Sequence, residues 1–242
     1  MKQISSDQYY TQLVPSYREV ARKRSNYNRA VDSLVAQLAQ NRKYSSWLDI
    51  GTGNGDRLLQ LLKRIGTGPS VVCLEPSALM YEEAKSKLGS YALVINSALD
   101  AYSDEGKKKF SIITALWNVI GHTDNPAKFV KDAYAMLDDD GYLLFDANNR
   151  YNIKQYGIFS VIRNALSDFL GLGSNGLFKL RTDDPNEFTF VYIASPNEIR
   201  RACRMLDGAK HTIYFIDYRT GKPTSCLEGQ MVVSISRGAA PC

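Results

Sequence analysis

The sequence predicts an α/β fold: a doubly wound, mostly parallel sheet of seven strands with the last strand in a hairpin. Three observations predict it. Short apolar runs alternate along the chain with segments of helical periodicity, as in parallel sheets covered by helices on both faces. The stretch Trp47–Leu58, WLDIGTGNGDRL, joins one such run to a helix through three glycines. The 242 residues are 44% apolar and 23% charged, which is typical of one globular domain.

Five apolar runs are expected to form the parallel strands: Trp47–Ile50, Val71–Leu74, Leu93–Ile95, Ile112–Leu116 and Tyr142–Phe145. Between the first two runs, the spacing i, i+3, i+4, i+7 predicts one buried helix stripe, made of Leu58, Leu61, Leu62 and Ile65. Between the last two runs, Asp124-Asn125-Pro126 predicts an N-cap followed by a proline in the first helical turn. The buried stripe of that helix is expected to be Phe129, Val130, Ala133 and Leu137.

The pattern changes after Arg150. A helix is predicted over Ile153–Leu170, ended by the glycine-rich Gly171–Leu177, and the segment from Tyr151 to Asp184 is expected to be an insertion at the rim without sheet. The remaining elements are a strand at Phe188–Ile193, a helix that enters through a capping box of Ser195 and Glu198, and a hairpin of His211–Tyr218 and Gln230–Ser236.

Composition limits the class of protein. No window approaches 18 uninterrupted apolar residues, so no membrane span is predicted, and MKQISSDQYY lacks the apolar region of a secretory signal. We therefore expect a cytoplasmic location. The four cysteines show no CxxC pair and no metal-ligand spacing with either histidine. The net charge of +5 is spread along the chain except for one late basic cluster, interpreted as a solvated helix face: Arg200, Arg201, Arg204, Lys210, Arg219 and Lys222.

The glycine loop indicates a nucleotide site without phosphates. A strand, a glycine turn and a helix place backbone N–H groups around a ligand. Gly51, Gly53 and Gly55 are followed by Asp56, where a dinucleotide loop has its third spaced glycine, and no P-loop motif is present. Asp49 and Asp56 would oppose a pyrophosphate by about 1 kcal/mol or more. They suit S-adenosyl-L-methionine, a nucleoside that carries a sulfonium and an ammonium group.

Glu75 supports the same cofactor. It ends the second apolar run, where a carboxylate can accept hydrogen bonds from both ribose hydroxyls. A surface glutamate and an unliganded tight turn are the alternative interpretations of Glu75 and of the glycines. Their combination in one βαβ unit favours the cofactor.

These stretches resemble the class I S-adenosylmethionine-dependent methyltransferases of the small-molecule type, and the resemblance covers most of the chain. DIGTGNG is similar to their first motif, VVCLEPS to their acidic second-strand motif, and INSALD lies where the family contacts adenine. FSIITALWNVIGHTDNPAKFVKDAYAMLDDDGYLLFD is similar to their fourth strand, its loop, the next helix and the fifth strand. YTQLVPSY resembles the N-terminal cap. The resemblance implies a Rossmann-like fold, S-adenosyl-L-methionine as cofactor and S-adenosyl-L-homocysteine as product.

The resemblance also implies residue roles. Asp49 and the glycines would face the methionine portion and the sugar, Glu75 would bind the ribose, and Pro76 and Met80 would lie against adenine. The full set of implied cofactor residues is Tyr17, Asp49, Gly51, Thr52, Gly53, Gly55, Glu75, Pro76, Met80, Ser97, Ala98, Leu99, Leu116 and Trp117. Ser97 departs from the family, which often has Asp there.

One domain with four parts is therefore expected. An N-terminal helical cap covers residues 1–43 and a cofactor-binding core covers 44–150. A lid-like insertion follows at 151–187, and the C-terminal strands and helix at 188–242 complete the sheet.

Two clusters at the carboxyl ends of strands are candidates for binding the acceptor: Trp117–His122 and Asp146–Tyr151. His122 is a candidate general base for a hydroxyl, because its unperturbed pKa is near neutrality, or else a packing residue. Asp146 is a candidate catalytic residue that could deprotonate an amine. Substrate contacts are predicted for Tyr10, Asn118, Asn148, Asn149, Arg150 and Tyr151, with solvation of a loop as the alternative for the polar run.

The predicted function is methylation of a small molecule, at the oxygen of a natural product or sugar-like metabolite. Nitrogen methylation of a small amine or amino sugar is the alternative. An RNA methyltransferase is a lower alternative, because LWNV stands where enzymes acting on base amines carry [DN]-P-P-[YFW]. A non-catalytic partner subunit is another. No metal site, no membrane and no nucleic-acid partner are expected, and the chain is expected to be a monomer or homodimer.

Overall fold

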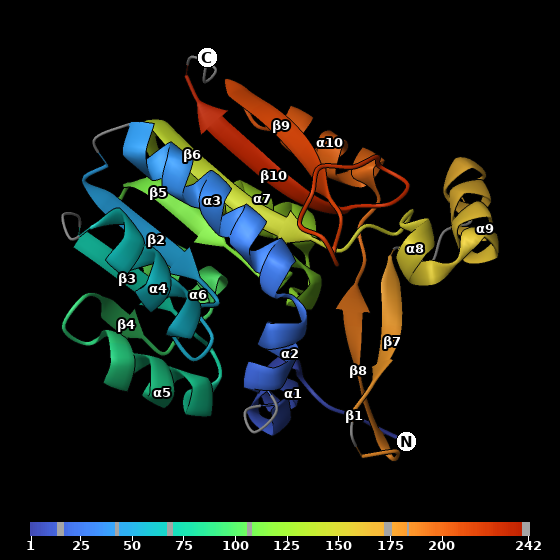
Figure 1. Ribbon diagram of the computed structural model, residues 1–242, viewed down its shortest axis with the longest axis horizontal. Coiled ribbons are helices and arrows are strands. Elements are labelled where there is room, and N and C mark those ends of the chain that lie inside the picture. Colours follow the sequence, from blue (N-terminus) through green and yellow to red (C-terminus); the bar gives the residue numbers. More distant parts are fainter. Residues whose placement is uncertain are drawn as a thin grey trace.

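The computed structural model describes residues 1–13, 17–41, 44–66, 70–105, 108–171, 176–182 and 184–238. Its centre is a seven-stranded sheet in the order β4-β3-β2-β5-β6-β10-β9 (Figure 1). The five parallel strands are β2 (Ser46–Ile50), β3 (Ser70–Leu74), β4 (Leu93–Ile95), β5 (Phe110–Ala115) and β6 (Leu137–Ala147). The hairpin of β9 (Ala209–Ile216) and β10 (Gln230–Arg237) closes the sheet antiparallel to β6. The predicted fold class is confirmed.

Strand β2 lies between β3 and β5. The strands that follow it in sequence, β3 and β4, lie on one side of it, and β5 and β6 lie on the other, so the strand order reverses at β2. In an open α/β sheet this switch in strand order leaves a crevice at the carboxyl ends of the strands, where ligands bind. The end of β2 at Ile50, the end of β3 at Leu74 and the end of β5 at Ala115 border that crevice.

Helices cover both faces of the sheet and define two cores. On one face, α3 (Ser25–Asn41), α4 (Asp56–Ile65) and α5 (Ala78–Leu88) pack on alternate residues such as Trp47 and Cys73. On the other, α6 (Leu99–Glu105), α7 (Pro126–Ala135) and α10 (Pro196–Arg204) pack around residues such as Leu48 and Phe145. Successive strand residues point to opposite faces, so each apolar run contributes to both cores.

Local signals in the sequence place these helices. Leu58, Leu61 and Leu62 form the buried stripe of α4. The side chain of Asn125 caps α7 by accepting a hydrogen bond from the Lys128 backbone N–H at 3.0 Å. The capping box of α10 is also present. Leu137 was expected on the stripe of α7 but begins β6, because the helix ends at Ala135.

Two predictions about the inserted segment are wrong. The expected single helix is divided into α8 (Ile153–Tyr156) and α9 (Ile158–Phe169), because Gly157 adopts a φ of 77° between them. The inserted segment also contains a strand, β7 (Leu177–Arg181), which pairs with β8 (Glu187–Tyr192).

A second sheet forms where none was expected, because β8 also pairs in parallel with β1 (Lys2–Gln3) at the N-terminal end. Strand β8 therefore belongs to this three-stranded sheet and does not complete the main one. No local pattern in the sequence indicates a pairing between segments so far apart in the chain. It brings the first residues of the protein beside the C-terminal part of the domain (Figure 1).

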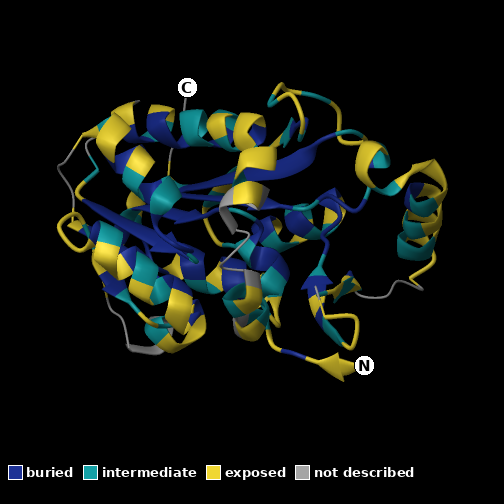
Figure 2. Ribbon diagram, turned by 60° about the horizontal axis from the view of Figure 1, so that its bottom comes forward, coloured by how far each residue is buried: buried dark blue, intermediate teal, exposed yellow. Residues whose placement is uncertain are grey.

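The N-terminal helices α1 (Ser6–Leu13) and α2 (Tyr17–Lys23) lie below α3 in the view of Figure 1. Helix α9 projects from the body and is largely exposed (Figure 2), with Phe159 and Phe169 each more than four-fifths exposed. Across the described ranges, no helix combines the length and the apolar character that crossing a membrane requires.

Candidate cofactor and active site

A cavity of about 320 Å³ opens at the carboxyl ends of β2, β3 and β5. It brings together residues predicted for both the cofactor and the acceptor. Those residues are Tyr10, Gly51, Gly53, Glu75, Pro76, Met80, Ser97, Ala98, Leu99, Leu116, Trp117 and His122. Helix α1 borders it, since Thr11 Oγ1 lies 3.3 Å from the Ser77 Oγ at the start of α5. The side chain of Tyr17, also predicted to contact the cofactor, lies outside the described part of the chain.

The glycine loop needs its glycines for conformation and for space. Gly51, Gly53 and Gly55 have φ values of 68°, 60° and 79°, in the left-handed region that side chains disfavour. A Cβ atom on Gly51 would lie 2.6 Å from a methyl carbon of Val119, in the loop after β5. The Gly51 backbone N–H donates to the Leu74 carbonyl at 2.8 Å, which ties the loop to the end of β3.

Glu75 is held beneath this loop. One carboxylate oxygen accepts a hydrogen bond from the Gly53 N–H at 2.8 Å, and the other accepts one from the Ser77 N–H at 2.9 Å. The residue is only 5% exposed, and burial raises the pKa of its carboxyl to about 7 although both hydrogen bonds oppose the shift. Each oxygen keeps a further lone pair with which it can accept from a ribose hydroxyl.

The end of the cavity that is predicted to hold adenine is lined by apolar and polar side chains. Met80 is fully buried there, and Ser97, Ala98 and Leu99 line the same cavity. The Ser97 hydroxyl donates to the Ala98 carbonyl at 3.0 Å. Asp100 also lines the cavity and was not predicted as a site residue. Its carboxylate lies three positions beyond Ser97, where the family often has Asp.

Asp49 lies behind the loop. It accepts a hydrogen bond of 2.5 Å from the Thr114 hydroxyl, which in turn accepts one from the Trp47 indole N–H at 2.7 Å. Burial raises the pKa of Asp49. Asp49 and Thr52 line a smaller cavity that adjoins the main one, and Gly55 begins α4.

His122 faces the main cavity from the 3₁₀ helix η2 (Val119–His122). Its ring stacks on Tyr9, with centroids 6.2 Å apart, and meets the edge of Tyr10 at 5.0 Å. Its Nδ1 lies 3.4 Å from the Ser6 hydroxyl. Burial, with a smaller contribution from the Arg24 charge, lowers the pKa of His122 to about 4. The imidazole is therefore neutral at pH 7 but only weakly basic.

Asp146 and the asparagines shape the loop after β5. The Asp146 carboxylate accepts a hydrogen bond from the Asn118 N–H at 2.6 Å, and the Asn118 side-chain oxygen accepts one from the Asn148 N–H at 2.9 Å. Trp117 and Asn118 both have positive φ, 76° and 58°. These contacts hold a strained turn. Trp117 lines the main cavity, whereas Asn118, Asp146 and Asn148 are not among its lining residues.

The remaining predicted acceptor residues also lie apart from this cavity. The amide of Asn149, fully buried, donates to the carbonyls of Cys226 and Gly229 at 2.6 and 2.8 Å. The Arg150 guanidinium pairs with Asp168 at 3.0 Å and with Glu198 at 2.8 Å, and the Tyr151 hydroxyl donates to Asp168 at 2.6 Å. These side chains connect the end of β6 to α9, α10 and the loop between β9 and β10.

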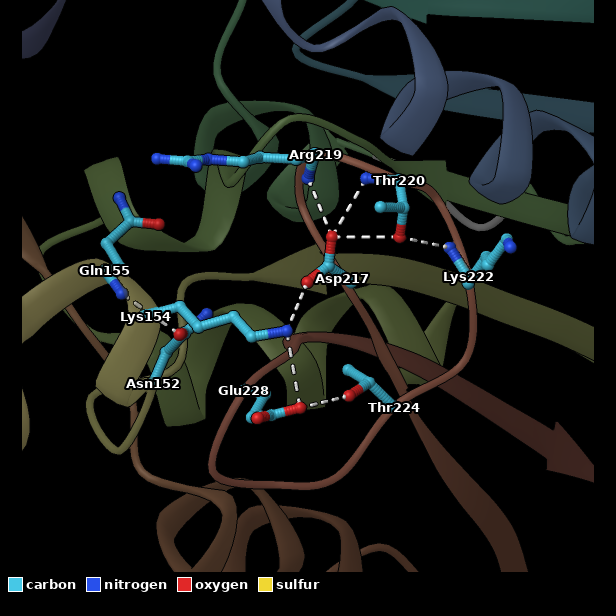
Figure 3. Close-up of polar contacts among 9 residues, drawn as sticks. All are labelled: Asn152, Lys154, Gln155, Asp217, Arg219, Thr220, Lys222, Thr224 and Glu228. Carbon is cyan, nitrogen blue, oxygen red and sulfur yellow. Dashed lines mark hydrogen bonds and ion pairs between the residues drawn. The ribbon is translucent and has the colours of Figure 1, made fainter.

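That C-terminal loop is fixed by a second polar network (Figure 3). The Lys154 ammonium of α8 pairs with Asp217 at 2.9 Å and with Glu228 at 3.3 Å. Asp217 also accepts hydrogen bonds from the backbone and hydroxyl of Thr220. Lys154, followed by Thr220, holds the pKa of Asp217 well below its ordinary value. The network precedes Tyr218, whose ring stacks on that of Tyr27 in α3 with centroids 5.7 Å apart.

Sequence reasoning missed a charged layer between α3 and the glycine loop. Arg57 in the first turn of α4 donates to Asp32 of α3 at 2.8 Å. The Arg24 guanidinium lies 5.3 Å from the Trp117 ring centroid and 5.0 Å from that of Tyr218. One signal in the sequence indicates this layer. Arg57 lies in the first turn of a helix, where a cation is unfavourable because it opposes the helix dipole, so a nearby anion is expected. In the described ranges, no group of three or more His, Cys, Asp or Glu side chains could hold a metal ion.

The fold, the glycine loop and the buried Glu75 together define a class I S-adenosylmethionine-dependent methyltransferase domain. The chain belongs to the family described as "Methyltransferase domain", whose model matches residues 21–170. It is 26% identical over 165 residues to an uncharacterized protein, MJ1252, of Methanocaldococcus jannaschii. The matched part covers 66% of this chain, and the chain spans 60% of the length of that relative.

Solved structures share the whole fold at low sequence identity. The plantazolicin methyltransferase BpumL in complex with S-adenosylhomocysteine superposes with a TM-score of 0.64 at 13% identity, over 96% of this chain and 94% of that one. A Thermotoga maritima S-adenosylmethionine-dependent methyltransferase, described as a possible histamine N-methyltransferase, gives 0.60 at 17% identity, over 95% and 98%. Magnesium protoporphyrin IX methyltransferase of Synechocystis, with bound S-adenosylmethionine, gives 0.56 at 14% identity, over 88% and 81%. The predicted family and fold are confirmed.

Proposed function

We propose that this protein transfers the methyl group of S-adenosylmethionine to a heteroatom of a small molecule. One observation carries the proposal: a single cavity is lined both by Glu75 with the glycine loop and by Tyr10 with His122. A cofactor with its ribose on Glu75 and an acceptor beside Tyr10 would share this space. Bringing two reactants together in one enclosed site is the main contribution a protein makes to an in-line displacement.

The basicity of His122 bears on the acceptor atom. The sequence favoured an oxygen acceptor with His122 as general base, and an amine as the alternative. A pKa of about 4 leaves His122 a poor base for an ordinary hydroxyl group. We therefore infer that nitrogen is the better supported acceptor, since an amine that enters deprotonated needs no strong base. The description of the Thermotoga maritima structure as a possible histamine N-methyltransferase is consistent with this inference.

Product analysis tests both parts of the proposal. The protein is incubated with S-adenosylmethionine carrying a deuterated methyl group and with matched panels of small amines and small alcohols or phenols. Mass spectrometry then follows S-adenosylhomocysteine and the labelled product. We expect labelled methyl on nitrogen. Label on alcohol oxygen only would restore the oxygen acceptor, and cofactor binding without turnover on any panel would favour the non-catalytic partner subunit.

A further inference from the structure

Helix α9 turns polar residues toward the body of the protein and apolar residues toward solvent. Asp168 pairs with the buried Arg150 at 3.0 Å, and Ser160 and Asn164 line a cavity together with Phe178. A helix that packs on a core has the reverse arrangement. The outward face carries six large apolar residues that are 49–86% exposed: Ile158, Phe159, Ile162, Leu166, Phe169 and Leu170. The fold of a single chain does not account for this face, which we call the α9 apolar face (Figure 2).

The area of the α9 apolar face is large for a protein that works alone. At roughly 150–200 Å² for a fully exposed residue, these six residues present about 600–800 Å² to solvent. The largest apolar patch on a typical monomer measures about 300–600 Å². Two such faces packed together would bury about 1,200–1,600 Å², which lies in the range of specific, stable protein interfaces.

The spacing of the residues on this face fits a second helix of the same sequence. Phe159, Ile162, Leu166 and Phe169 follow one another at steps of three, four and three, which is the a/d spacing of a two-helix seam. This set of steps is symmetric about its centre. In an antiparallel pair of α9 helices, Phe159 would meet Phe169 of the partner subunit, and Ile162 would meet Leu166 of the partner subunit. A two-fold dimer requires this kind of self-complementarity.

The charges of α9 favour a second copy over a lipid surface. Arg163 is the single basic residue between Ile158 and Phe169, and Asp168 is the single acidic one. Helices that lie on anionic membranes carry several Lys or Arg residues on their polar face. In the antiparallel pair, Arg163 would lie opposite the small, exposed Ala165, so like charges do not meet across the seam.

We propose that two copies of this protein associate through an antiparallel pair of α9 helices that buries the α9 apolar face of each copy. The inference goes beyond methyl transfer and does not depend on it. Each copy keeps its own main cavity, because the six residues of the α9 apolar face are not among the residues that line it.

Sedimentation velocity of the full chain between about 1 and 100 μM tests the proposal. We expect the wild type to become dimeric within this range. Phe159→Lys combined with Phe169→Lys places two like charges at each end of the seam and should weaken the association at least a hundredfold. Phe159→Lys combined with Phe169→Glu pairs opposite charges in the antiparallel arrangement, so it should recover part of the lost affinity.

The matched control is Met205→Lys, because Met205 is 69% exposed and lies at the end of another helix, α10. It should leave the association unchanged. All the substituted side chains are exposed, so circular dichroism and the melting temperature should show folded variants.

Three results would overturn the proposal. A wild-type protein that stays monomeric at 100 μM would remove the dimer, and binding of that monomer to vesicles of phosphatidylcholine and phosphatidylglycerol would assign the α9 apolar face to a membrane surface. A dimer that survives the double lysine variant would place the interface elsewhere. Equal weakening by both double variants would exclude the antiparallel arrangement.

Discussion

Replacing Glu75 by glutamine keeps the size of the side chain and removes its charge. In the structure both carboxylate oxygens already accept backbone hydrogen bonds, from Gly53 and Ser77. Ribose hydroxyls add to these when the cofactor binds. A glutamine offers one oxygen where the glutamate offers two, and its NH₂ group would face a backbone N–H. Loss of one charge-assisted hydrogen bond costs about 1.5–3 kcal/mol, so S-adenosylhomocysteine should bind about 10- to 100-fold more weakly.

The raised pKa of Glu75 adds a pH dependence with a defined sign. The carboxyl group has a pKa of about 7 in the free protein, and its ionised form is the one that accepts both hydroxyls. Affinity should therefore fall as the pH falls through 7. The ionised fraction drops about tenfold between pH 8 and pH 6, and the apparent affinity of the wild-type protein should fall by about that factor. His122, with a pKa of about 4, does not titrate in this window.

Isothermal titration calorimetry at pH 8, 7 and 6 measures both effects. The Glu75→Gln variant should bind weakly at all three pH values and show no slope. Two results would refute the reasoning: a wild-type affinity that does not change between pH 8 and pH 6, or a variant that binds as tightly as the wild type at pH 8.

Three further changes have defined outcomes. Gly51→Ala should lower the free energy of unfolding by about 1–3 kcal/mol in urea titrations, more than Gly66→Ala, because both sites have positive φ but only Gly51 faces Val119 within 4 Å. Equal losses would remove the steric part of the argument. Asn149→Ala should cost about 1–3 kcal/mol of stability, because it leaves the buried Gly229 carbonyl without its donor and removes the hydrogen bond to the Cys226 carbonyl, while the folded variant keeps its S-adenosylhomocysteine affinity. A loss of affinity without a loss of stability would place Asn149 in the binding site after all. His122→Ala should retain most turnover on an amine at pH 7 to 8; a loss above a hundredfold would restore His122 as the base.

The sheet and the helices that connect its strands could be predicted because their signals are local. The same holds for the glycine loop and Glu75. The apolar runs, the Asn125 cap and the capping box of α10 each act within a few residues. The glycine loop and Glu75 likewise lie on adjoining strands of one βαβ unit, so their spacing in the sequence determines their proximity.

The acceptor side could not be predicted in the same way, because its contacts join distant parts of the chain. Asn149 and Arg150 looked like a polar site at the end of a strand, but their partners are Cys226, Gly229, Asp168 and Glu198. Which polar residues face a cavity and which are consumed by structural hydrogen bonds depends on tertiary contacts that no spacing reveals.

The charged layer shows the same limit. Asp32 stands 25 positions before Arg57, in a helix whose placement over the glycine loop decides that they meet. The sequence indicated only that Arg57 opposes the helix dipole. Its ion pair with Asp32 became visible only in the structure.

A crystal structure of this protein with S-adenosylhomocysteine is the most direct test of the account. We expect the ribose hydroxyls on the Glu75 carboxylate and the adenine between Met80 and Ala98. The sulfur should face the side of the cavity that holds Tyr10 and His122. A ligand bound elsewhere, or one whose ribose makes no contact with Glu75, would contradict the account.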